Sequence, residues 1–303
     1  MASRSQVVLV TGASSGIGKA VASAFQSKGF TVFGTSRKPA QAAAIPGVEF
    51  VELDVTVPNS VSTAVATVIE RAGGIDILIN NAGVVLLGAA EESSVTQALQ
   101  LFDTNFFGLV RLTNEVLPHL RAQGGGRIIN IGSAMGFLPA PYTAFYGASK
   151  YAIEGYSESL DHETREFGIR VSVVEPGYTR TSIDAQMMEP DSPIATYAVR
   201  RQNAHQVFVK AMETADEPAI VAKVVIKAAT SRKPKIRYPA GRAASALSLL
   251  KRFGPGAALD LGIRRANKLP PTASRSTTPT PLHGTPEVGK PSPPPRSLAV
   301  PPT

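Results

Sequence analysis

Hydrophobic positions along the first 240 residues form two kinds of segment that alternate. Short runs rich in valine and isoleucine, mostly uninterrupted by polar residues, are typical of parallel strands covered on both faces. Longer segments with helical periodicity separate these runs. The predicted strands are Val7–Val10, Thr31–Gly34, Glu49–Leu53, Ile75–Asn80, Arg127–Ile131, Arg170–Glu175 and Lys235–Tyr238. The predicted helices are Gly16–Lys28, Ser60–Ala72, Thr96–Arg121, Thr143–Phe167 and Pro218–Thr230. This alternation predicts an α/β fold with a doubly wound parallel sheet.

The composition changes at about residue 270. From there to residue 303, proline, serine and threonine dominate and apolar residues become rare. Such a segment buries too little surface to offset the entropy lost on ordering. We therefore expect residues 1–269 to form a single domain and residues 270–303 to be a disordered tail. A role for its proline runs as a ligand is the alternative.

The net charge of +8 is concentrated toward the C-terminus. Between residues 231 and 268, ten lysines and arginines accompany one acid, Asp260. The first 230 residues are nearly neutral, so we expect no nucleic-acid partner. The bases are mixed with leucines over about residues 242–268, which predicts basic amphipathic helices. Such helices can lie on an anionic membrane surface or cap their own domain, and the second is our expectation.

Two absences in the sequence narrow the class of protein. No apolar stretch reaches the roughly 20 residues of a membrane span, and the first apolar run is too short for a signal peptide, so we expect a cytoplasmic protein. The chain has no cysteine, and its four histidines share no ligand spacing. We therefore predict no metal site.

A glycine-rich segment, Thr11–Gly18, follows the first predicted strand and opens the first predicted helix. Its sequence is Thr-Gly-Ala-Ser-Ser-Gly-Ile-Gly. Glycines permit a tight turn and the close approach of a pyrophosphate, whose charge is met by backbone N–H groups at a helix N-terminus. The strand–loop–helix context predicts a dinucleotide site.

A second motif places Tyr146 and Lys150 one helical turn apart, so they share a helix face. A free tyrosine has a pKa near 10 and exchanges protons poorly at neutral pH. A neighbouring cation favours the phenolate and is expected to lower the pKa of Tyr146. The pair is therefore a candidate general acid/base.

These motifs occur with others in a fixed order, and the set resembles the short-chain dehydrogenase/reductase family from about residue 6 to residue 240. The further matching elements are Leu53-Asp54-Val55, Asn80-Asn81-Ala82-Gly83, Asn105 within Thr104–Gly108, Ser133, and the run from Pro176 to Thr181. The resemblance implies a Rossmann-like domain, a nicotinamide cofactor and a homodimer or homotetramer. The stretch Tyr238–Arg242 is also similar to 17β-hydroxysteroid-dehydrogenase-like members.

The resemblance assigns roles to four candidate catalytic residues. Tyr146 is expected to protonate a carbonyl oxygen, or to deprotonate an alcohol in the reverse direction. Lys150 is expected to lower the pKa of Tyr146 and to hold the nicotinamide ribose. Ser133 is expected to bind the substrate oxygen, and Asn105 to anchor a water that links Lys150 to solvent.

The resemblance also predicts the cofactor contacts. Ser36 stands where an acid would bind the ribose 2′-hydroxyl of NAD, and Arg37 beside it favours the 2′-phosphate of NADP(H). The alternative is that Arg37 is only a solvated loop charge. The predicted cofactor-binding residues are Gly12, Ser14, Ser15, Gly16, Ile17, Gly18, Ser36, Arg37, Asp54, Val55, Asn81, Ala82, Gly83, Asn105, Tyr146, Lys150, Pro176, Gly177, Thr179 and Thr181.

The segment after Thr181 is predicted to form a helical substrate lid over about residues 182–215. Its apolar residues are Met187, Met188, Ile194, Tyr197, Val199, Phe208, Val209 and Met212. They either contact a hydrophobic ketone or secondary alcohol, of steroid, retinoid or lipid type, or only pack the lid onto the core. The expected protein is an NADP(H)-dependent oxidoreductase. The alternatives are a non-catalytic NADP-sensing regulator and an epimerase or dehydratase.

Overall fold

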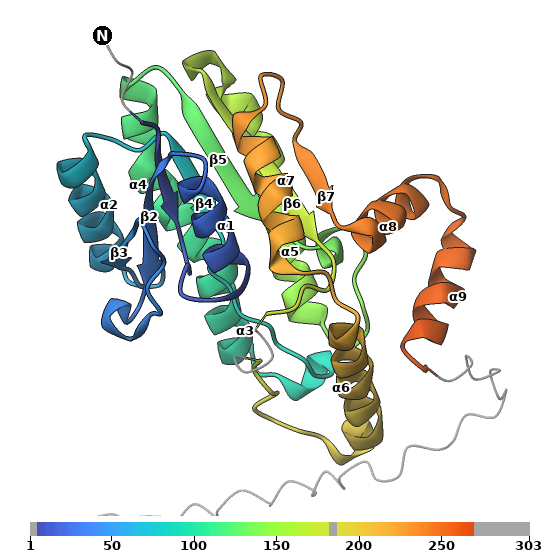
Figure 1. Cartoon of the computed structure of the whole chain (residues 1–303). Coiled ribbons are helices and arrows are strands. Elements are labelled where there is room, and N and C mark those ends of the chain that lie inside the picture. Colours follow the sequence, from blue (N-terminus) through green and yellow to red (C-terminus); the bar gives the residue numbers. More distant parts are fainter. Residues whose placement is uncertain (1–4, 182–186, 270–303) are drawn as a thin grey trace, which may run out of the picture. The chain divides into compact units, whose positions relative to one another are not determined.

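The predicted parallel sheet forms the centre of the computed structural model, which describes residues 5–181 and 187–269 (Figure 1). Its order is β3-β2-β1-β4-β5-β6-β7, and every neighbouring pair is parallel. The strands are β1 Val7–Val10, β2 Thr31–Ser36, β3 Val48–Glu52, β4 Ile77–Asn80, β5 Gly126–Ile131, β6 Ile169–Pro176 and β7 Arg237–Ala240. β1 and β4 are buried along their whole length, which explains their uninterrupted apolar runs.

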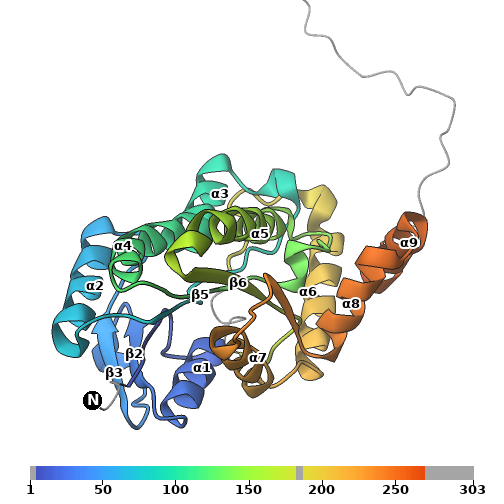
Figure 2. The ribbon, with the colours of Figure 1, turned by 90° about the horizontal axis from the view of Figure 1, so that it is seen from above.

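Helices cover both faces of the sheet, as Figure 2 shows from above. Helices α1 (Gly16–Gln26) and α7 (Pro218–Thr230) share one apolar cluster with the strands. Helices α2 (Pro58–Ala72), α4 (Gly108–Ala122) and α5 (Ala144–Thr164) share the cluster on the opposite face. The doubly wound α/β prediction is confirmed.

The helix predicted over Thr96–Arg121 is divided into three parts. Helix α3 (Val95–Phe102) leads into a π-helical turn, Asp103–Phe107, and then into α4. Arg111 Nη2 lies 2.5 Å from Asp103 Oδ1, across the π turn. A Cβ at Gly108 would lie 2.7 Å from Val55, so this helix approaches the loop after β3 closely. A π turn inserts one residue into the helix and is frequent at functional sites.

Beyond β6, three helices lie in segments that were predicted to be helical, without individual bounds. Helix α6 (Ala198–Glu213) lies in the predicted lid, of which residues 182–186 lie outside the described part. Helices α8 (Arg242–Phe253) and α9 (Gly256–Ala266) occupy the predicted amphipathic segment. The predicted tail, residues 270–303, lies outside the described residues.

The order of the strands determines where a ligand can enter. The chain winds outward from β1 to β3, returns to β4 beside β1, and then winds in the opposite direction to β7. The connections after β1 and β4 therefore diverge and leave a crevice at the carboxyl ends of these strands. In open parallel sheets, ligands bind in this crevice.

Candidate active site

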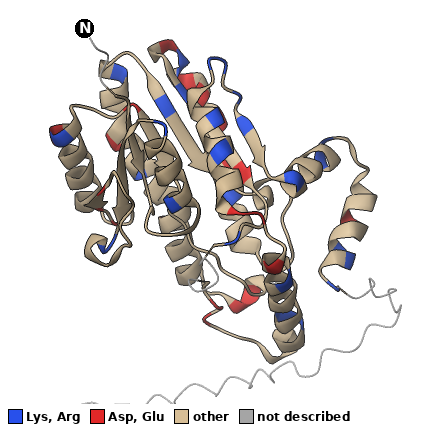
Figure 3. Ribbon diagram, in the orientation of Figure 1, with Lys and Arg blue, Asp and Glu red and all other residues tan. Residues whose placement is uncertain are grey.

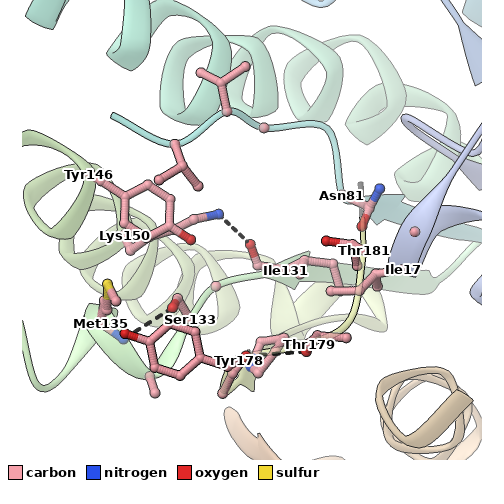
Figure 4. A pocket seen from close by; sticks show the side chains of 18 of the residues that line it. Ile17, Asn81, Ile131, Ser133, Met135, Tyr146, Lys150, Tyr178, Thr179 and Thr181 are labelled. Atoms are coloured by element: carbon pink, nitrogen blue, oxygen red, sulfur yellow. Dashed lines mark hydrogen bonds between the residues drawn. The ribbon is translucent and has the colours of Figure 1, made fainter. Parts of the chain in front are cut away.

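A cavity of about 1610 Å³ lies at this switch point. All of the predicted catalytic and cofactor-binding residues line it except Gly18 and Asn105. Figure 4 shows Tyr146, Lys150, Ser133 and Thr181 around the same space, although they come from different elements. The volume exceeds the roughly 300–1,000 Å³ of a pocket for one small ligand. It can therefore hold a dinucleotide and a substrate together.

The glycine loop has the backbone geometry that a phosphate site requires. Gly12 and Gly16 have φ values of +62° and +53°, a region that side chains other than glycine rarely adopt. Ser15 precedes helix α1, and its side chain makes no capping hydrogen bond. The backbone N–H groups at the start of α1 are thus left to a ligand. This arrangement fits the pyrophosphate of a dinucleotide.

Gly18 serves packing rather than contact with the cavity. A Cβ at this position would lie 2.3 Å from the carbonyl oxygen of Gly12 and 2.6 Å from Asn81 Nδ2. Asn81 Nδ2 donates to the carbonyl oxygens of Thr11 at 2.8 Å and Gly12 at 3.2 Å. Gly18 does not line the cavity, and its contact with the cofactor stays a prediction. It lets α1 approach the loop that Asn81 holds against β4.

The adenine end of the cavity contains Ser36, Arg37 and Asp54. Arg37 is exposed, and β2 ends at Ser36 without an acid. Asp54 accepts hydrogen bonds from the backbone N–H and the hydroxyl of Thr56, at 2.9 and 2.7 Å. Burial alone would raise the pKa of Asp54. The two hydrogen bonds from Thr56 and the charge of Arg37 outweigh burial and hold this pKa below its usual value. The Arg37 guanidinium therefore lies near enough to Asp54 to influence its charge.

Lys150 lies close to Tyr146 on α5, as their spacing predicts. Its ammonium is 5.7 Å from the centre of the Tyr146 ring and donates a 3.0 Å hydrogen bond to the Ile131 carbonyl oxygen (Figure 4). Ser133 follows β5, and its hydroxyl accepts a 3.1 Å hydrogen bond from the Met135 N–H. The end of β5 thus positions both the lysine and the serine beside the tyrosine.

The pKa of Tyr146 is raised rather than lowered. Burial of the phenol raises the pKa of Tyr146, the hydrogen bond with Ser133 lowers it, and nearby Tyr178 raises it further. Burial also lowers the pKa of Lys150 to about 8, although the charge of Glu154 works the other way. The Lys150 ammonium lies over the Tyr146 ring and donates a hydrogen bond to the Ile131 carbonyl oxygen. Burial therefore outweighs attraction here.

Asn105 lies in the π turn and is buried outside the cavity. Its Oδ1 accepts from the Val84 N–H at 2.8 Å, and its Nδ2 donates to the Val84 carbonyl at 2.9 Å and to Ser149 Oγ at 3.2 Å. These bonds connect the loop after β4 to the helix that carries Tyr146 and Lys150. Asn105 therefore positions the site from behind, whereas the predicted water contact stays a prediction.

Comparison with known proteins identifies the family. A model of the short chain dehydrogenase family matches residues 6–192. The chain belongs to the short-chain dehydrogenase/reductase family. A 3-ketodihydrosphingosine reductase of Bacteroides thetaiotaomicron is 37% identical over 238 residues, which cover 78% of this chain and 88% of the relative. The uncharacterized oxidoreductase YbbO of Escherichia coli is 36% identical over 84% of this chain and 92% of the relative. A short-chain dehydrogenase of Streptomyces avermitilis has a crystal structure that matches with a TM-score of 0.75 at 32% identity, over 88% of this chain and 98% of that one.

Membership in the family makes the chain an oxidoreductase with a fold that binds a nicotinamide cofactor. The family model ends at residue 192, but the cavity continues beyond it. Its apolar wall there comes from α6, α8 and α9. The side chains of this wall are Val207, Phe208, Met212, Leu247, Leu250, Leu259 and Ile263. This part of the short-chain dehydrogenase is the candidate substrate side.

Only some of the apolar residues predicted in the lid lie where they could contact a substrate. Phe208 and Met212 line the cavity, whereas Met187 lines a separate, smaller pocket. Val199 and Val209 are exposed. Helix α6 therefore presents only part of its apolar surface to the candidate substrate side.

Glu92 holds α6 to the rest of the short-chain dehydrogenase, and no sequence pattern predicted this role. Its carboxylate is fully buried and pairs with Arg201 of α6. It also accepts hydrogen bonds from the Ala89 N–H at 3.0 Å and the Ile194 N–H at 2.9 Å. One carboxylate thus fixes both the start of the lid segment and its helix.

A second buried polar group lies behind Lys150. Glu154 lies one helical turn further along α5 and against Glu175 at the end of β6. Arg237 of β7 donates a 2.9 Å hydrogen bond to the Glu154 carboxylate. Burial raises the pKa of Glu175 to about 8 and also raises the pKa of Glu154. Burial and the charge of the neighbouring carboxylate therefore favour the protonated form of Glu175.

A buried amide network fixes the centre of the sheet. Asn80 Nδ2 donates to Asn130 Oδ1 at 2.9 Å and to Thr113 Oγ1 at 3.1 Å. Asn130 Nδ2 in turn donates to Ser157 Oγ at 2.8 Å. The network ties β4 and β5 to α4 and α5, whose ends carry the site. An asparagine inside the buried run Arg127–Ile131 was the available sequence signal.

Among the described residues, no group of histidines and carboxylates is arranged to hold a metal ion.

Proposed function

We propose that this short-chain dehydrogenase transfers a hydride between NADP(H) and a hydrophobic ketone or secondary alcohol with a long apolar chain. The observation that carries the proposal is the continuity of the cavity. It joins the glycine loop and Arg37 to Tyr146, Ser133 and Lys150, and then to the apolar wall of α6, α8 and α9. The relative from Bacteroides is named for 3-ketodihydrosphingosine, a long-chain ketone, which supports this substrate class.

The chain's own residues supply the proton chemistry. In the reductive direction, Tyr146 donates its phenolic proton to the carbonyl oxygen, and Ser133 donates a hydrogen bond to the same oxygen as its charge develops. NADPH, when bound, would supply the hydride that the carbonyl carbon accepts. Lys150, which is charged below a pH of about 8, stabilises the phenolate that remains. In the oxidative direction the phenolate accepts the alcohol proton.

The glycine loop and the α1 N-terminus would hold the pyrophosphate, and Arg37 would pair with the 2′-phosphate. Lys150 would hold the nicotinamide ribose, and Thr179 and Thr181 would lie on the nicotinamide side. Thr181 already closes against the loop, since a Cβ at Gly16 would lie 3.0 Å from its side chain.

The test is consumption of NADPH over a panel of carbonyl compounds. The panel contains 3-ketodihydrosphingosine, straight-chain ketones of increasing length, steroid and retinoid ketones, and small polar ketones. We expect kcat/KM to rise up to about fourfold with each added methylene, until the apolar wall is filled. Faster turnover of small polar ketones would contradict the substrate class. Tight NADPH binding without turnover of any compound would favour the sensing regulator, and conversion without net NADPH consumption would favour the epimerase or dehydratase.

A further inference from the structure

Helices α8 and α9 form part of the cavity wall within the described part of the chain. Leu247 and Leu250 of α8 and Leu259 and Ile263 of α9 line the cavity. Ala244, near the start of α8, is the only residue of these two helices that is fully buried. Figures 1 and 2 show α9 at the edge of the domain, away from the sheet. The two helices thus form a wall with one face to the cavity and one face outward.

The outward face is also apolar. Leu249 and Phe253 lie one helical turn apart on α8, so they share a face, and their exposed fractions are 62% and 72%. Leu261 of α9 is 48% exposed. A helix that is apolar on two sides is typical of a buried element, yet the described residues cover only one of these sides. We call Leu249, Phe253 and Leu261 the apolar strip.

Basic residues outnumber acidic ones on the two helices that carry the apolar strip (Figure 3). Six lysines and arginines between residues 242 and 268 accompany one acid, Asp260. These bases are Arg242, Lys251, Arg252, Arg264, Arg265 and Lys268. The guanidinium of Arg252 lies 5.3 Å from the centre of the Phe253 ring, so a cation borders the most exposed aromatic ring of the strip.

The charge selects among the partners that could cover the strip. A second copy of the chain, related by twofold symmetry, would place this positive surface against itself, which like charges oppose. An anionic lipid surface matches both features, because the apolar side chains enter the interface while the bases remain among the head groups. No helix in the described parts of the chain is long and apolar enough to cross a bilayer, so the contact would be peripheral.

We propose that α8 and α9 form a docking surface for an anionic lipid bilayer. The apolar strip inserts at the interface, and the bases of the same helices bind anionic head groups. Other side chains of the same two helices line the cavity, so docking brings the wall of the candidate substrate side next to the lipid. The docking itself does not depend on the reaction, because it can be measured without turnover. Only the route of a lipid substrate into the cavity rests on the proposed function.

The test is co-sedimentation of the full-length protein with vesicles. Vesicles of equimolar phosphatidylcholine and phosphatidylglycerol are compared with vesicles of phosphatidylcholine alone. The protein should bind the anionic vesicles at least tenfold more strongly, because each base near the surface contributes about 1 kcal/mol, or about fivefold in affinity. The double variant Leu249→Ser/Phe253→Ser should weaken binding by roughly tenfold or more. Arg265→Gln/Lys268→Gln should weaken it by about fivefold per charge and only on anionic vesicles.

The matched control is Val95→Ser/Leu99→Ser on α3. These residues are as exposed as the apolar strip, at 76% and 59%, and lie outside the cavity lining, so binding should not change. Absence of vesicle binding by the wild type would overturn the proposal. So would equal binding by the α8 double variant. An oligomer in analytical ultracentrifugation that Leu249→Ser/Phe253→Ser dissociates, without vesicle binding, would show that a second copy covers the strip. Unchanged melting temperatures of the surface variants confirm that they fold.

Discussion

If the proposed preference for NADPH over NADH rests on Arg37, replacing this residue by alanine should remove most of it. Arg37 directly follows β2, is exposed at the adenine end of the cavity, and contributes to the lowered pKa of Asp54. The substitution removes the positive charge near the expected 2′-phosphate. It also leaves the Asp54 carboxylate without that neighbouring cation, so a phosphate there meets more repulsion. Binding of NADH, which lacks the phosphate, should change little.

The size of the effect follows from the exposure of Arg37. A hydrogen bond to a charged group contributes about 1.5–3 kcal/mol. Solvent screening of an exposed arginine favours the lower end of this range. We therefore expect the dissociation constant of NADPH to rise about tenfold to thirtyfold. Adding Ser36→Asp supplies a carboxylate for the ribose 2′-hydroxyl and should reverse the preference.

The assay is isothermal calorimetry with NADPH and NADH on the wild type, Arg37→Ala and Ser36→Asp/Arg37→Ala. Lys28→Ala is the matched control, because Lys28 is also exposed but lies beyond the opposite end of α1 and outside the cavity lining. Tighter binding of NADH than NADPH by the wild type would refute the reasoning. Equal losses of both cofactors on Arg37→Ala would show that the residue supports the loop rather than the phosphate.

Three further results are expected. Burial raises the pKa of Glu175 to about 8, above the roughly 4.3 of a free glutamate, so the folded state loses stability as the pH rises between these two values. The melting temperature of Glu175→Gln should therefore exceed that of the wild type at about pH 9 and differ little from it at about pH 5. A difference in melting temperature that does not depend on pH would contradict the assigned pKa. Carbonyl reduction should decline as pH rises through about 8, because burial lowers the pKa of Lys150 to about 8 and the ammonium loses its charge; a rate profile that stays flat to about pH 9 would count against that role. Gly18→Ala should lower the free energy of unfolding by about 1–3 kcal/mol, because the added Cβ would lie 2.3 Å from the Gly12 carbonyl oxygen. The control is Gly155→Ala in α5, where the added Cβ meets no atom within 4 Å. Melting curves should show the loss of stability for Gly18→Ala and none for Gly155→Ala.

Most strands of the sheet and the location of the candidate site could be predicted from the sequence. A parallel sheet covered on both faces favours continuous apolar strands; β1 is apolar throughout, and β4 is apolar up to its last residue, Asn80. The glycines of the loop after β1 are required by positive φ and close packing, so their spacing is visible in the chain. Tyr146 and Lys150 are linked by helical spacing alone.

Features that depend on contacts distant in sequence were not visible. The π turn at Asn105 rests on the Arg111–Asp103 pair and on the approach of Gly108 to Val55. Glu92 pairs with Arg201, which lies 109 residues away. The raised pKa of Tyr146 depends on how deeply the phenol is buried and on where the Lys150 ammonium points, and spacing fixes neither of them.

The most direct test of the catalytic assignment is a single-turnover measurement on Tyr146→Phe. The variant deletes the hydroxyl that exchanges the proton and keeps the ring that lines the cavity. With NADPH bound and a ketone that the wild type reduces, we predict that hydride transfer slows by roughly a hundredfold or more. The affinity for NADPH, measured by calorimetry on the same sample, should stay within about twofold of the wild type. A rate equal to that of the wild type, with NADPH fully bound, would contradict the role of Tyr146 as the general acid.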